Sequence, residues 1–336
     1  MSEFRVRILQ LRDQAYNNGV RLGEAFRAVQ QRFEAMVRPQ IDFDEMKRIY
    51  TGFAPHLLEE IYGAAEGLGC GVAKASALLS GYDIPSIPAM GCSALITDRY
   101  YVRNYDFTPA IYDGLFTLNE TGEAYASAGY NLQGIGRHDG VNEHGLAAGL
   151  HFVSFDGYRK GLSPWISVRF ILEMCRDVDE ASDMLKEIPH AACYNFSLGD
   201  AMGNMAVVEA SPSGVTVRKG GVAMDCVNHF EEQKGKNRQS IEHSLRRSRY
   251  IQRLKTGDLS HRQAFEMFKD LQSPLFFTDY EQWFGTLHTF SYNYEESTIM
   301  TALARGNTLQ FSFREWMDGR DLSEMHLSGR LERKGE

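Results

Sequence analysis

The sequence lacks any segment that would place it in a membrane. No run of consecutive apolar residues reaches the roughly 18 that a membrane-spanning helix requires. The first residues, which include Glu3, Arg5 and Arg7, also lack the uninterrupted apolar core of a signal peptide. We therefore expect a soluble, cytoplasmic protein without a membrane partner.

Cysteine pairs and an excess of positive charge are missing as well. The 5 cysteines are widely scattered, and no two of them form a Cys-x-x-Cys pair. An odd number at such spacing is typical neither of a disulfide framework nor of a zinc ribbon. The formal net charge is -8, so the chain has no broad basic surface, and we expect no nucleic-acid partner.

Several catalytic motifs are absent. The sequence contains no Gly-x-x-x-x-Gly-Lys-[Ser/Thr] phosphate loop, no His-Glu-x-x-His zinc motif and no Gly-x-Ser-x-Gly elbow. Gly67, Gly69 and Gly71 superficially resemble a nucleotide-binding loop, but they follow a predicted helix rather than a strand and indicate a helix stop. Nor do histidines such as His151 and His288 have the spacing of a metal site. We expect neither a metal nor a cofactor.

The remaining pattern predicts helices layered on antiparallel sheets. Apolar residues recur at helical spacing in the first ninety residues, and after residue 93 the pattern changes to β-branched and aromatic runs. Strands are predicted at residues 94–97, 100–103, 146–155, 194–199, 205–210, 215–218, 287–292 and 298–304. Helices are predicted at residues 165–188, 241–254 and 261–271, the last with Ser260 and Gln263 in the form of a capping box. This order indicates an α+β sandwich rather than a parallel doubly wound sheet.

Cys92 stands where the pattern changes. It follows Gly91, and a residue without a side chain gives a thiol an unobstructed approach to the preceding carbonyl. Cleavage between Gly91 and Cys92 would give Cys92 a free α-amine beside its own thiol. Because an α-amine titrates near pH ~8, an appreciable fraction at neutral pH can act as the base that activates the thiol. The sequence therefore predicts a cysteine nucleophile that self-processing exposes.

Two charged residues lie on the second strand of the predicted hairpin, beside Cys92. Arg103 would favour the thiolate, and Asp106 would hold the α-amine by hydrogen bonds. Taken alone, the two charges fit a structural ion pair equally well, and Cys92 fits a buried small apolar residue, as most cysteines do. The functional interpretation depends on the occurrence of all three together.

This combination resembles a known family. Gly91 and Cys92, followed by Arg103, Asn104 and Asp106, are similar to the cleavage site and the Arg-Asn-x-Asp strand of the acyl-coenzyme A:6-aminopenicillanic acid acyltransferase family. That family lies within the choloylglycine hydrolase and acid ceramidase relatives of the N-terminal-nucleophile (Ntn) hydrolases. Further similar segments are residues 54–60, 63–67, 142–146, 149–152, 194–196, 200–203, 208–209, 227–230 and 244–247.

The resemblance implies a fold and a division of the chain. The fold would be an αββα sandwich, in which two antiparallel sheets lie between helical layers. Self-cleavage would separate a helical pro-segment, residues 1–91, from a catalytic domain, residues 92–336.

The resemblance also implies roles for individual residues. The implied catalytic set is Cys92 as nucleophile, Arg103 and Asp106 as its partners, Asn228 as a donor to the oxyanion, and Arg247. Arg249 is the alternative to Arg247 for the last position. The residues expected to contact the substrate are His151, Tyr194 and Asn195, although bile-salt hydrolases tend to have asparagine at the position of His151.

The implied activity is cleavage of a linear carbon–nitrogen amide bond of a small N-acyl substrate through an acyl-enzyme on Cys92. Transfer of the acyl group to an amine is a second outcome of the same intermediate, but the sequence shows no coenzyme A site and hydrolysis is favoured. A catalytically silent member that never matures and a papain-like Cys-His hydrolase are the rival hypotheses. The two halves of the substrate and the oligomeric state, a homo-oligomer included, stay open.

Overall fold

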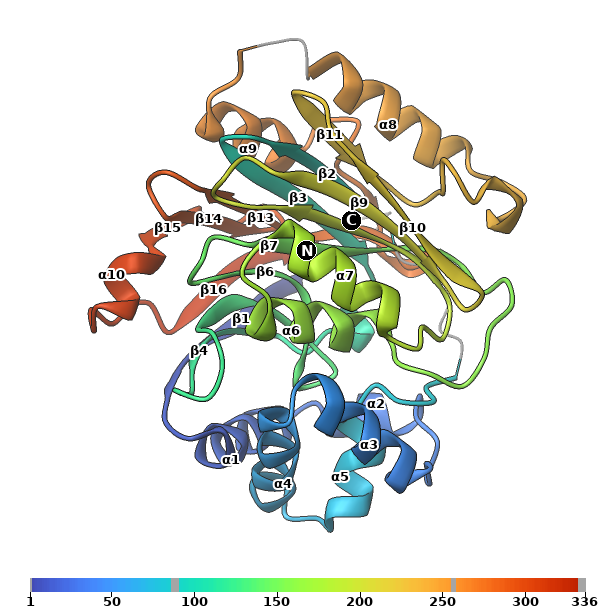
Figure 1. Cartoon of the computed structure of the whole chain (residues 1–336). Helices are drawn as coiled ribbons and strands as arrows, with labels where there is room; N and C mark the ends of the chain where they lie inside the picture. Colours follow the sequence, from blue (N-terminus) through green and yellow to red (C-terminus); the bar gives the residue numbers. More distant parts are fainter. Residues whose placement is uncertain (1, 86–90, 255–257, 332–336) are drawn as a thin grey trace.

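The centre of the molecule is a pair of β-sheets packed face to face, with helices on both outer sides (Figure 1). The computed structural model describes residues 2–85, 91–254 and 258–331. Strands β2 and β7 lie against each other across the interface between the sheets, as do β13 and β6. The predicted α+β class is confirmed.

The first sheet, counted over the described residues, has nine strands in the order β10-β9-β8-β7-β6-β5-β4-β1-β16. These strands are β1 (Ser2–Arg12), β4 (Leu115–Glu120), β5 (Ser127–Leu132), β6 (Gly136–Asn142), β7 (Ala147–Ser154), β8 (Cys193–Gly199), β9 (Met205–Ser211), β10 (Gly214–Lys219) and β16 (His326–Leu331). Neighbouring strands are antiparallel, except that β1 runs parallel to β4. Helices α6 (Pro164–Met174) and α7 (Val178–Glu187) cover the outer face of this sheet.

The second sheet has seven strands within the described ranges, in the order β11-β2-β3-β13-β14-β15, with β12 beside β13. They are β2 (Gly91–Thr97), β3 (Tyr100–Phe107), β11 (Ala223–Cys226), β12 (Thr278–Asp279), β13 (Phe284–Asn293), β14 (Thr298–Leu303) and β15 (Leu309–Ser312). Helices α8 (Glu242–Leu254) and α9 (His261–Lys269) cover it, and the short helix α10 (Phe313–Met317) follows β15. The capping box predicted at Ser260 and Gln263 is present. Every residue of β2 and β3 is buried, because these strands have a sheet on one side and helices on the other.

Residues 1–91, which we call the leader, correct one prediction. They were expected to be helical, but β1 occupies residues 2–12 and only then do helices follow. The apolar residues Val6 and Ile8 are buried, whereas Arg5 and Arg7, which alternate with them, are exposed. This alternation has the period of a strand with one face on the core, not the period of a helix. The helices that follow are α1 (Ala15–Phe26), α2 (Gln30–Glu34), α3 (Phe43–Phe53), α4 (His56–Leu68) and α5 (Val72–Leu79).

Helices α1 and α4 pack backbone against backbone. A Cβ atom on Gly19 would lie 2.1 Å from the carbonyl oxygen of Glu60, and one on Gly63 would lie 1.9 Å from that of Tyr16. Glycine is required at both positions because no other residue permits this approach. Gly69 ends α4 in the left-handed conformation with φ 69°, so the predicted helix stop is confirmed there.

A buried cluster of charged side chains joins the leader to the sheets. On α4, Glu60 lies 2.8 Å from Arg169 Nη2, and His56 Nε2 lies 2.8 Å from a carboxylate oxygen of Glu173. Arg169 and Glu173, both on α6, are themselves 2.6 Å apart. Together with the insertion of β1 between β4 and β16, this cluster makes the leader an integral part of the sandwich.

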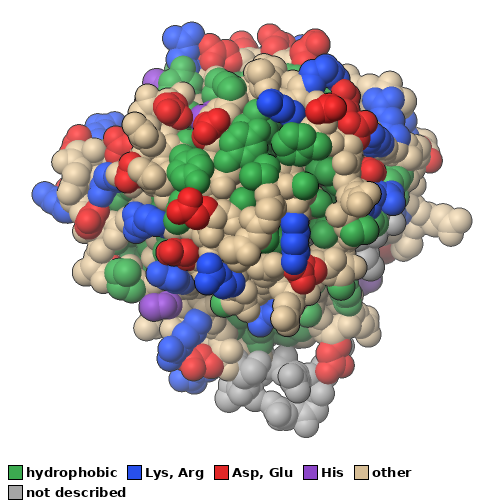
Figure 2. All heavy atoms as spheres, turned by 90° about the horizontal axis from the view of Figure 1, so that it is seen from below, with side chains coloured by type: hydrophobic (Ala, Val, Ile, Leu, Met, Phe, Trp, Pro, Cys, Tyr) green, Lys and Arg blue, Asp and Glu red, His purple; other side chains and the backbone are tan. Residues whose placement is uncertain are grey.

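Figure 2 views the molecule from the side of the leader helices. Lys, Arg, Asp and Glu side chains are scattered over this face, and apolar side chains gather near its centre. Among the described residues, none of the helices combines the length and the apolar character that crossing a membrane requires.

Candidate active site

Cys92 lies on β2 at the interface between the two sheets, and its side chain is fully buried. The predicted hairpin is confirmed, since β2 pairs with β3 so that Gly91 is opposite Asp106 and Cys92 is opposite Tyr105. This register brings the two predicted charged residues of β3 to the nucleophile candidate.

Arg103 contacts the sulfur directly. Its Nη2 atom donates to Cys92 Sγ over 3.0 Å and also to the carbonyl oxygen of Leu150, and its Nη1 atom pairs with a carboxylate oxygen of Asp139. Gly149 on β7 makes room for the arginine, because a Cβ atom there would lie 2.6 Å from Arg103 Cδ. The guanidinium is thus held on three sides and directs one N–H at the thiol.

The thiol is nevertheless protonated at neutral pH in the intact chain. Burial raises the pKa of Cys92 to about 12, although the positive charge of Arg103 acts in the opposite direction. Attack of the sulfur on a substrate therefore needs a proton acceptor, and a freed α-amine at the same residue would provide one.

Asp106 lies next to Cys92 with one oxygen unused. Its main-chain N–H bonds to the Cys92 sulfur, and Oδ1 accepts a hydrogen bond of 2.7 Å from Thr286 Oγ1. Oδ2 has no hydrogen-bond partner among the described residues and lies 3.9 Å from Arg247 Nη1. Burial raises the pKa of Asp106 to about 6, against the opposing effect of Arg247. One oxygen of this buried carboxylate can therefore accept a further hydrogen bond.

Asn228 and Arg247 bind the main chain of Cys92. The Cys92 N–H donates to Asn228 Oδ1 over 2.8 Å, and Arg247 Nη1 donates to the Cys92 carbonyl oxygen. Arg247 Nη2 also donates to Asn228 Oδ1 over 2.8 Å, while Asn228 Nδ2 donates to the carbonyl oxygen of Phe152. The Cys92 N–H and Arg247 Nη2 both donate to Oδ1 and thus fix the orientation of the Asn228 amide. The oxygen of Asn228 therefore faces Cys92 in the intact chain. Arg249 has a side chain that is 64% exposed, so Arg247 is the arginine that faces the site.

Gly91 has no room for a side chain. A Cβ atom there would lie 2.3 Å from Phe284 Cε2 and 3.0 Å from Asp106 Cβ. The packing around the bond between Gly91 and Cys92 therefore requires the glycine that the sequence places there.

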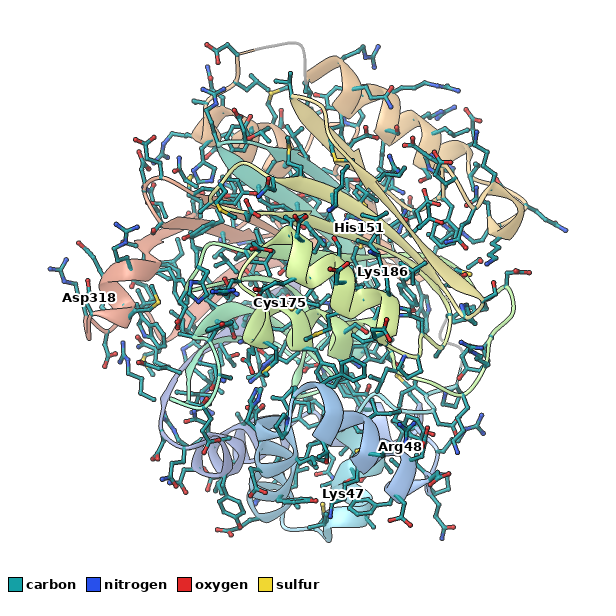
Figure 3. The ribbon with its side chains drawn as sticks, viewed as in Figure 1. Lys47, Arg48, His151, Cys175, Lys186 and Asp318 are labelled. Atoms are coloured by element: carbon teal, nitrogen blue, oxygen red, sulfur yellow. The ribbon has the colours of Figure 1, made fainter. Side chains whose placement is uncertain are left out.

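The three predicted substrate contacts lie in different settings. His151 is buried in the interior (Figure 3), with Nε2 2.9 Å from Ser197 Oγ, and burial lowers the pKa of its imidazole. Asn195 donates to the carbonyl oxygens of Val227 and His229 over 3.0 and 2.8 Å, so it supports the segment that carries Asn228. Tyr194 lines a cavity. In the intact chain His151 and Asn195 bond to protein groups, and their contact with a substrate stays a prediction.

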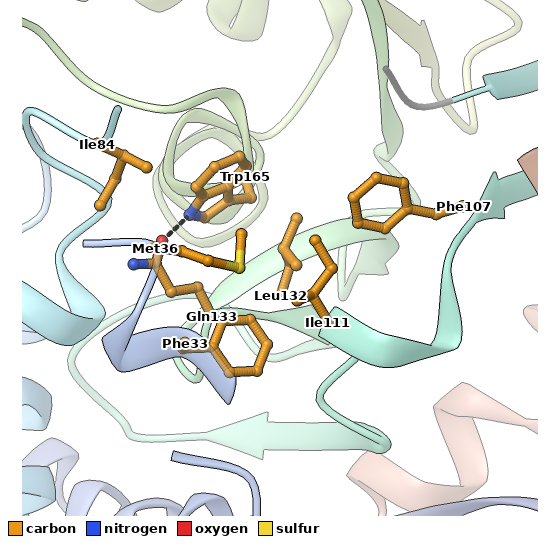
Figure 4. Close-up of a pocket in the computed structure, with 8 residues that line it drawn as sticks. All are labelled: Phe33, Met36, Ile84, Phe107, Ile111, Leu132, Gln133 and Trp165. Atoms are coloured by element: carbon orange, nitrogen blue, oxygen red, sulfur yellow. Dashed lines mark hydrogen bonds between the residues drawn. The ribbon is translucent and has the colours of Figure 1, made fainter. Parts of the chain in front are cut away.

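Two small apolar cavities lie between the leader and the sheets. The cavity in Figure 4 has a free volume of about 20 Å³, room for roughly one water molecule. It is lined by Phe33, Met36, Ile84, Phe107, Ile111, Leu132, Gln133 and Trp165. The second cavity shares Ile84 and Trp165 and includes Tyr194. Leader residues thus contribute to the walls of both cavities.

No group of three or more His, Cys, Asp or Glu side chains that could hold a metal ion occurs in residues 2–85, 91–254 and 258–331. The polar side chains that meet at Cys92 offer hydrogen bonds and charge rather than a ligand set.

Asp139 and His288 were not predicted to belong to the site. Asp139 on β6 pairs with Arg103, and His288 on β13 donates to or accepts from the same carboxylate over 2.9 Å. Asp139 lies three residues before the segment 142–146 that resembles the family, but nothing in its local pattern indicates that it lies across the sheet interface from Cys92.

The two sheets lie between helical layers, with Cys92 on a fully buried strand, so the arrangement is the αββα sandwich that the sequence predicts. The model of the acyl-coenzyme A:6-aminopenicillanic acid acyl-transferase family matches residues 96–308, well over half of the chain. The chain belongs to this family. The match includes the other four predicted catalytic residues but begins just after Cys92.

Solved structures of three proteins are similar to this chain over part of its length. Penicillin V acylase from Agrobacterium tumefaciens is 17% identical, with 67% of this chain and 86% of that chain covered and a TM-score of 0.45. A variant of the conjugated bile acid hydrolase from Clostridium perfringens is 14% identical, with 73% and 99% covered and a TM-score of 0.44. The Caenorhabditis elegans ortholog of N-acylethanolamine-hydrolyzing acid amidase is 11% identical, with 60% and 93% covered and a TM-score of 0.44. No curated protein matches the chain by sequence.

Proposed function

We propose that this protein is a self-processing cysteine amidohydrolase. It cuts its own chain between Gly91 and Cys92 and then cleaves a linear amide bond of a small N-acyl substrate. One observation carries the proposal: the sulfur, the main-chain nitrogen and the main-chain carbonyl of Cys92 are bound by Arg103, Asn228 and Arg247, respectively. Packing alone does not explain why polar side chains bind the sulfur, the nitrogen and the carbonyl of one buried cysteine.

Self-cleavage begins with attack of Cys92 Sγ on the carbonyl carbon of Gly91. The carbon–nitrogen bond between the two residues breaks, the nitrogen takes up the thiol proton, and a thioester joins Gly91 to the sulfur. Water then hydrolyses the thioester, which leaves a carboxylate on Gly91 and restores the thiol. The absence of a Cβ atom at Gly91 keeps the path to its carbonyl open.

The two chains remain together after the cut. β1 belongs to the smaller chain, yet it lies between β4 and β16 of the larger one and pairs with both. The buried cluster around Arg169 adds ionic contacts between α4 and α6. Separation of the chains would expose unpaired strand edges and buried charges, which is costly.

Turnover uses the new α-amine of Cys92 as the base. The amine stands where the amide nitrogen stood, facing Asn228 Oδ1, and the unused Oδ2 of Asp106 is available to orient it. It takes the thiol proton as the sulfur attacks the substrate carbonyl, and Arg103 stabilises the thiolate. The resulting ammonium then protonates the leaving amine, so that one residue supplies nucleophile, base and acid.

The oxyanion of the tetrahedral intermediate needs a donor, and we assign it to Asn228. Its Nδ2 group belongs to the same amide whose oxygen accepts a hydrogen bond from the Cys92 nitrogen, so it lies close to the proposed nucleophile. A preorganised neutral donor of this kind stabilises charge that develops on a carbonyl oxygen. Arg247 fixes the orientation of this amide.

The acyl-enzyme can pass its acyl group to water or to an amine. Water gives hydrolysis and an amine gives acyl transfer, the reaction for which the family is named. We favour hydrolysis because the sequence shows no coenzyme A site, and an assay with and without added acceptor amines separates the two outcomes.

The test compares the wild-type chain with Cys92→Ala and Cys92→Ser on a panel of N-acyl amides. Wild type is expected to yield two chains and to release amine, whereas Cys92→Ala stays a single chain without activity. Cys175→Ala, which removes another buried cysteine, serves as the matched control and keeps both properties. Activity in Cys92→Ala would overturn the proposal. Activity that survives chemical blocking of the α-amine would favour a papain-like mechanism, and an inert, uncut wild type would favour a silent member of the family.

A further inference from the structure

A chain of hydrogen bonds extends from Arg103 away from Cys92. Asp139 Oδ2 accepts from Arg103 Nη1 and lies 2.9 Å from His288 Nε2. His288 Nδ1 in turn lies 2.7 Å from the hydroxyl of Tyr112, which follows the short helical turn Pro109–Ile111. All of these side chains are buried, and they come from β3, β6, β13 and the loop before β4.

The hydrogen bonds of this network have a defined donor and acceptor at each step. Burial lowers the pKa of His288, so its imidazole is neutral and carries a single hydrogen. Nε2 faces an ionised carboxylate and must hold that hydrogen, which leaves Nδ1 as the acceptor for the Tyr112 hydroxyl. Burial by itself would raise the pKa of Asp139, but His288 and Arg103 outweigh it and lower the pKa to about 2.

Aromatic rings fix the imidazole in place. Tyr130 stacks on His288 with ring centres 3.7 Å apart and planes at 13°, and Tyr105 stacks at 5.3 Å and 18°. The other oxygen of Asp139 has no hydrogen-bond partner among the described residues, so its placement depends on Oδ2 alone. The titratable groups that face this carboxylate and imidazole are Arg103, Tyr101 and Tyr105 on β3, Tyr130 on β5, Arg137 and His138 on β6, and Tyr112.

We propose that Asp139, His288 and Tyr112 are positioning residues that hold the Arg103 guanidinium with one N–H directed at Cys92 Sγ. They touch neither the sulfur nor the position of a substrate carbonyl, and they act through Arg103. The proposal rests on the proposed role of Cys92 as nucleophile. It extends that role, because the reactivity of the thiol then also depends on three residues that do not contact it.

A buried ion pair that contributes only to folding is the competing explanation, and the two accounts predict opposite signs. If Arg103 stays in place without Asp139, its positive charge is no longer opposed, and the thiolate becomes more stable. If Asp139 positions Arg103, the guanidinium moves when the carboxylate is lost, and the thiolate becomes less stable. The direction of the change in thiol reactivity therefore separates positioning from simple electrostatics.

The experiment follows alkylation of Cys92 by iodoacetamide from pH 6 to pH 10, quantified by mass spectrometry of the peptide that contains it. Asp139→Asn is expected to slow alkylation at pH 7 by about 10- to 100-fold, the range found when a residue that orients a metal ligand is lost. His288→Leu should follow it, whereas His288→Asn, which keeps an N–H donor, should recover part of the rate. Thermal unfolding of each variant is measured in parallel.

Two tyrosines provide a matched pair. Tyr112→Phe removes the hydroxyl that bonds to His288, and Tyr130→Phe removes a hydroxyl of the same cluster that bonds to Thr301 Oγ1 instead. Both variants are nearly isosteric, which keeps the test valid even where Asp139→Asn fails to fold. We expect a shift of the alkylation profile to higher pH for Tyr112→Phe and none for Tyr130→Phe.

Faster or unchanged alkylation in Asp139→Asn would overturn the inference, as would equal shifts in the two tyrosine variants. Because alkylation reports on the thiol rather than on amide turnover, the test remains separate from the proposed function. A protein that cleaves no amide but shows the expected shifts would support the positioning residues and contradict the amidohydrolase.

Discussion

Gly91→Ala tests whether the geometry around the scissile bond governs self-cleavage. The added methyl carbon would lie 2.3 Å from Phe284 Cε2, and contacts under about 3 Å force something to move. It would also lie 3.0 Å from Asp106 Cβ, which belongs to the neighbouring strand and has little freedom to retreat. The Phe284 ring is half-buried and must swing away or push the Gly91 carbonyl out of line.

Overpacking of this kind costs about 1–3 kcal/mol. If that cost falls on the transition state for self-cleavage, the rate drops by roughly 5- to 150-fold. The assay follows conversion of freshly purified uncut chain into two chains by intact mass. Gly52→Ala on the exposed face of α3 is the matched control, because a Cβ atom there has nothing within 4 Å.

Phe284→Ala in the Gly91→Ala background provides the decisive comparison. Removal of the ring should restore part of the rate lost to the methyl group, beyond the effect of Phe284→Ala alone. Wild-type cleavage in Gly91→Ala, or a double variant no faster than the single one, would refute the argument that the ring excludes a side chain at this position.

Three further predictions follow from other contacts. Arg247→Met should abolish most turnover because it releases Asn228 and the Cys92 carbonyl, whereas Arg249→Met, two residues along the same helix, should leave turnover at the wild-type level. Burial raises the pKa of Asp113 to about 7, so its contribution to stability is complete below its unfolded pKa of about 4 and is lost as pH rises through 7. Asp113→Asn should flatten the fall in Tm between pH 5 and pH 8, and an unchanged slope would contradict this. Glu60→Leu should lower the free energy of unfolding by about 3 kcal/mol in urea titrations, since it removes one partner from a buried ion pair with Arg169, and a loss near zero would show that the cluster does not hold the leader.

Much of the fold could be predicted because it is encoded locally. The hairpin of β2 and β3, the meander of β8 to β10 and the capping box before α9 each rest on turn residues and alternation within a short stretch. β1 was missed although its alternation is visible, because the helices that follow dominate the composition of the leader. The strands β4 to β6 carry many polar residues that are buried only because two sheets and α6 enclose them, so their pattern does not stand out.

The site divides in the same way. Cys92, Arg103 and Asp106 lie on one hairpin, so their proximity followed from the register of two adjacent strands. The choice between Arg247 and Arg249 depends on which face of α8 lies against β2, and the sequence alone does not determine this face. Asp139 and His288 meet Arg103 across the interface between sheets, and contacts of that range leave no local signal.

The central claim is that turnover requires a free amine on Cys92. The most direct measurement combines amide turnover with intact mass and N-terminal sequencing of the same purified sample over time. If the amine is the base, activity rises in step with a second chain whose first residue is Cys92. Amide turnover by a sample in which the bond between Gly91 and Cys92 stays intact would contradict it.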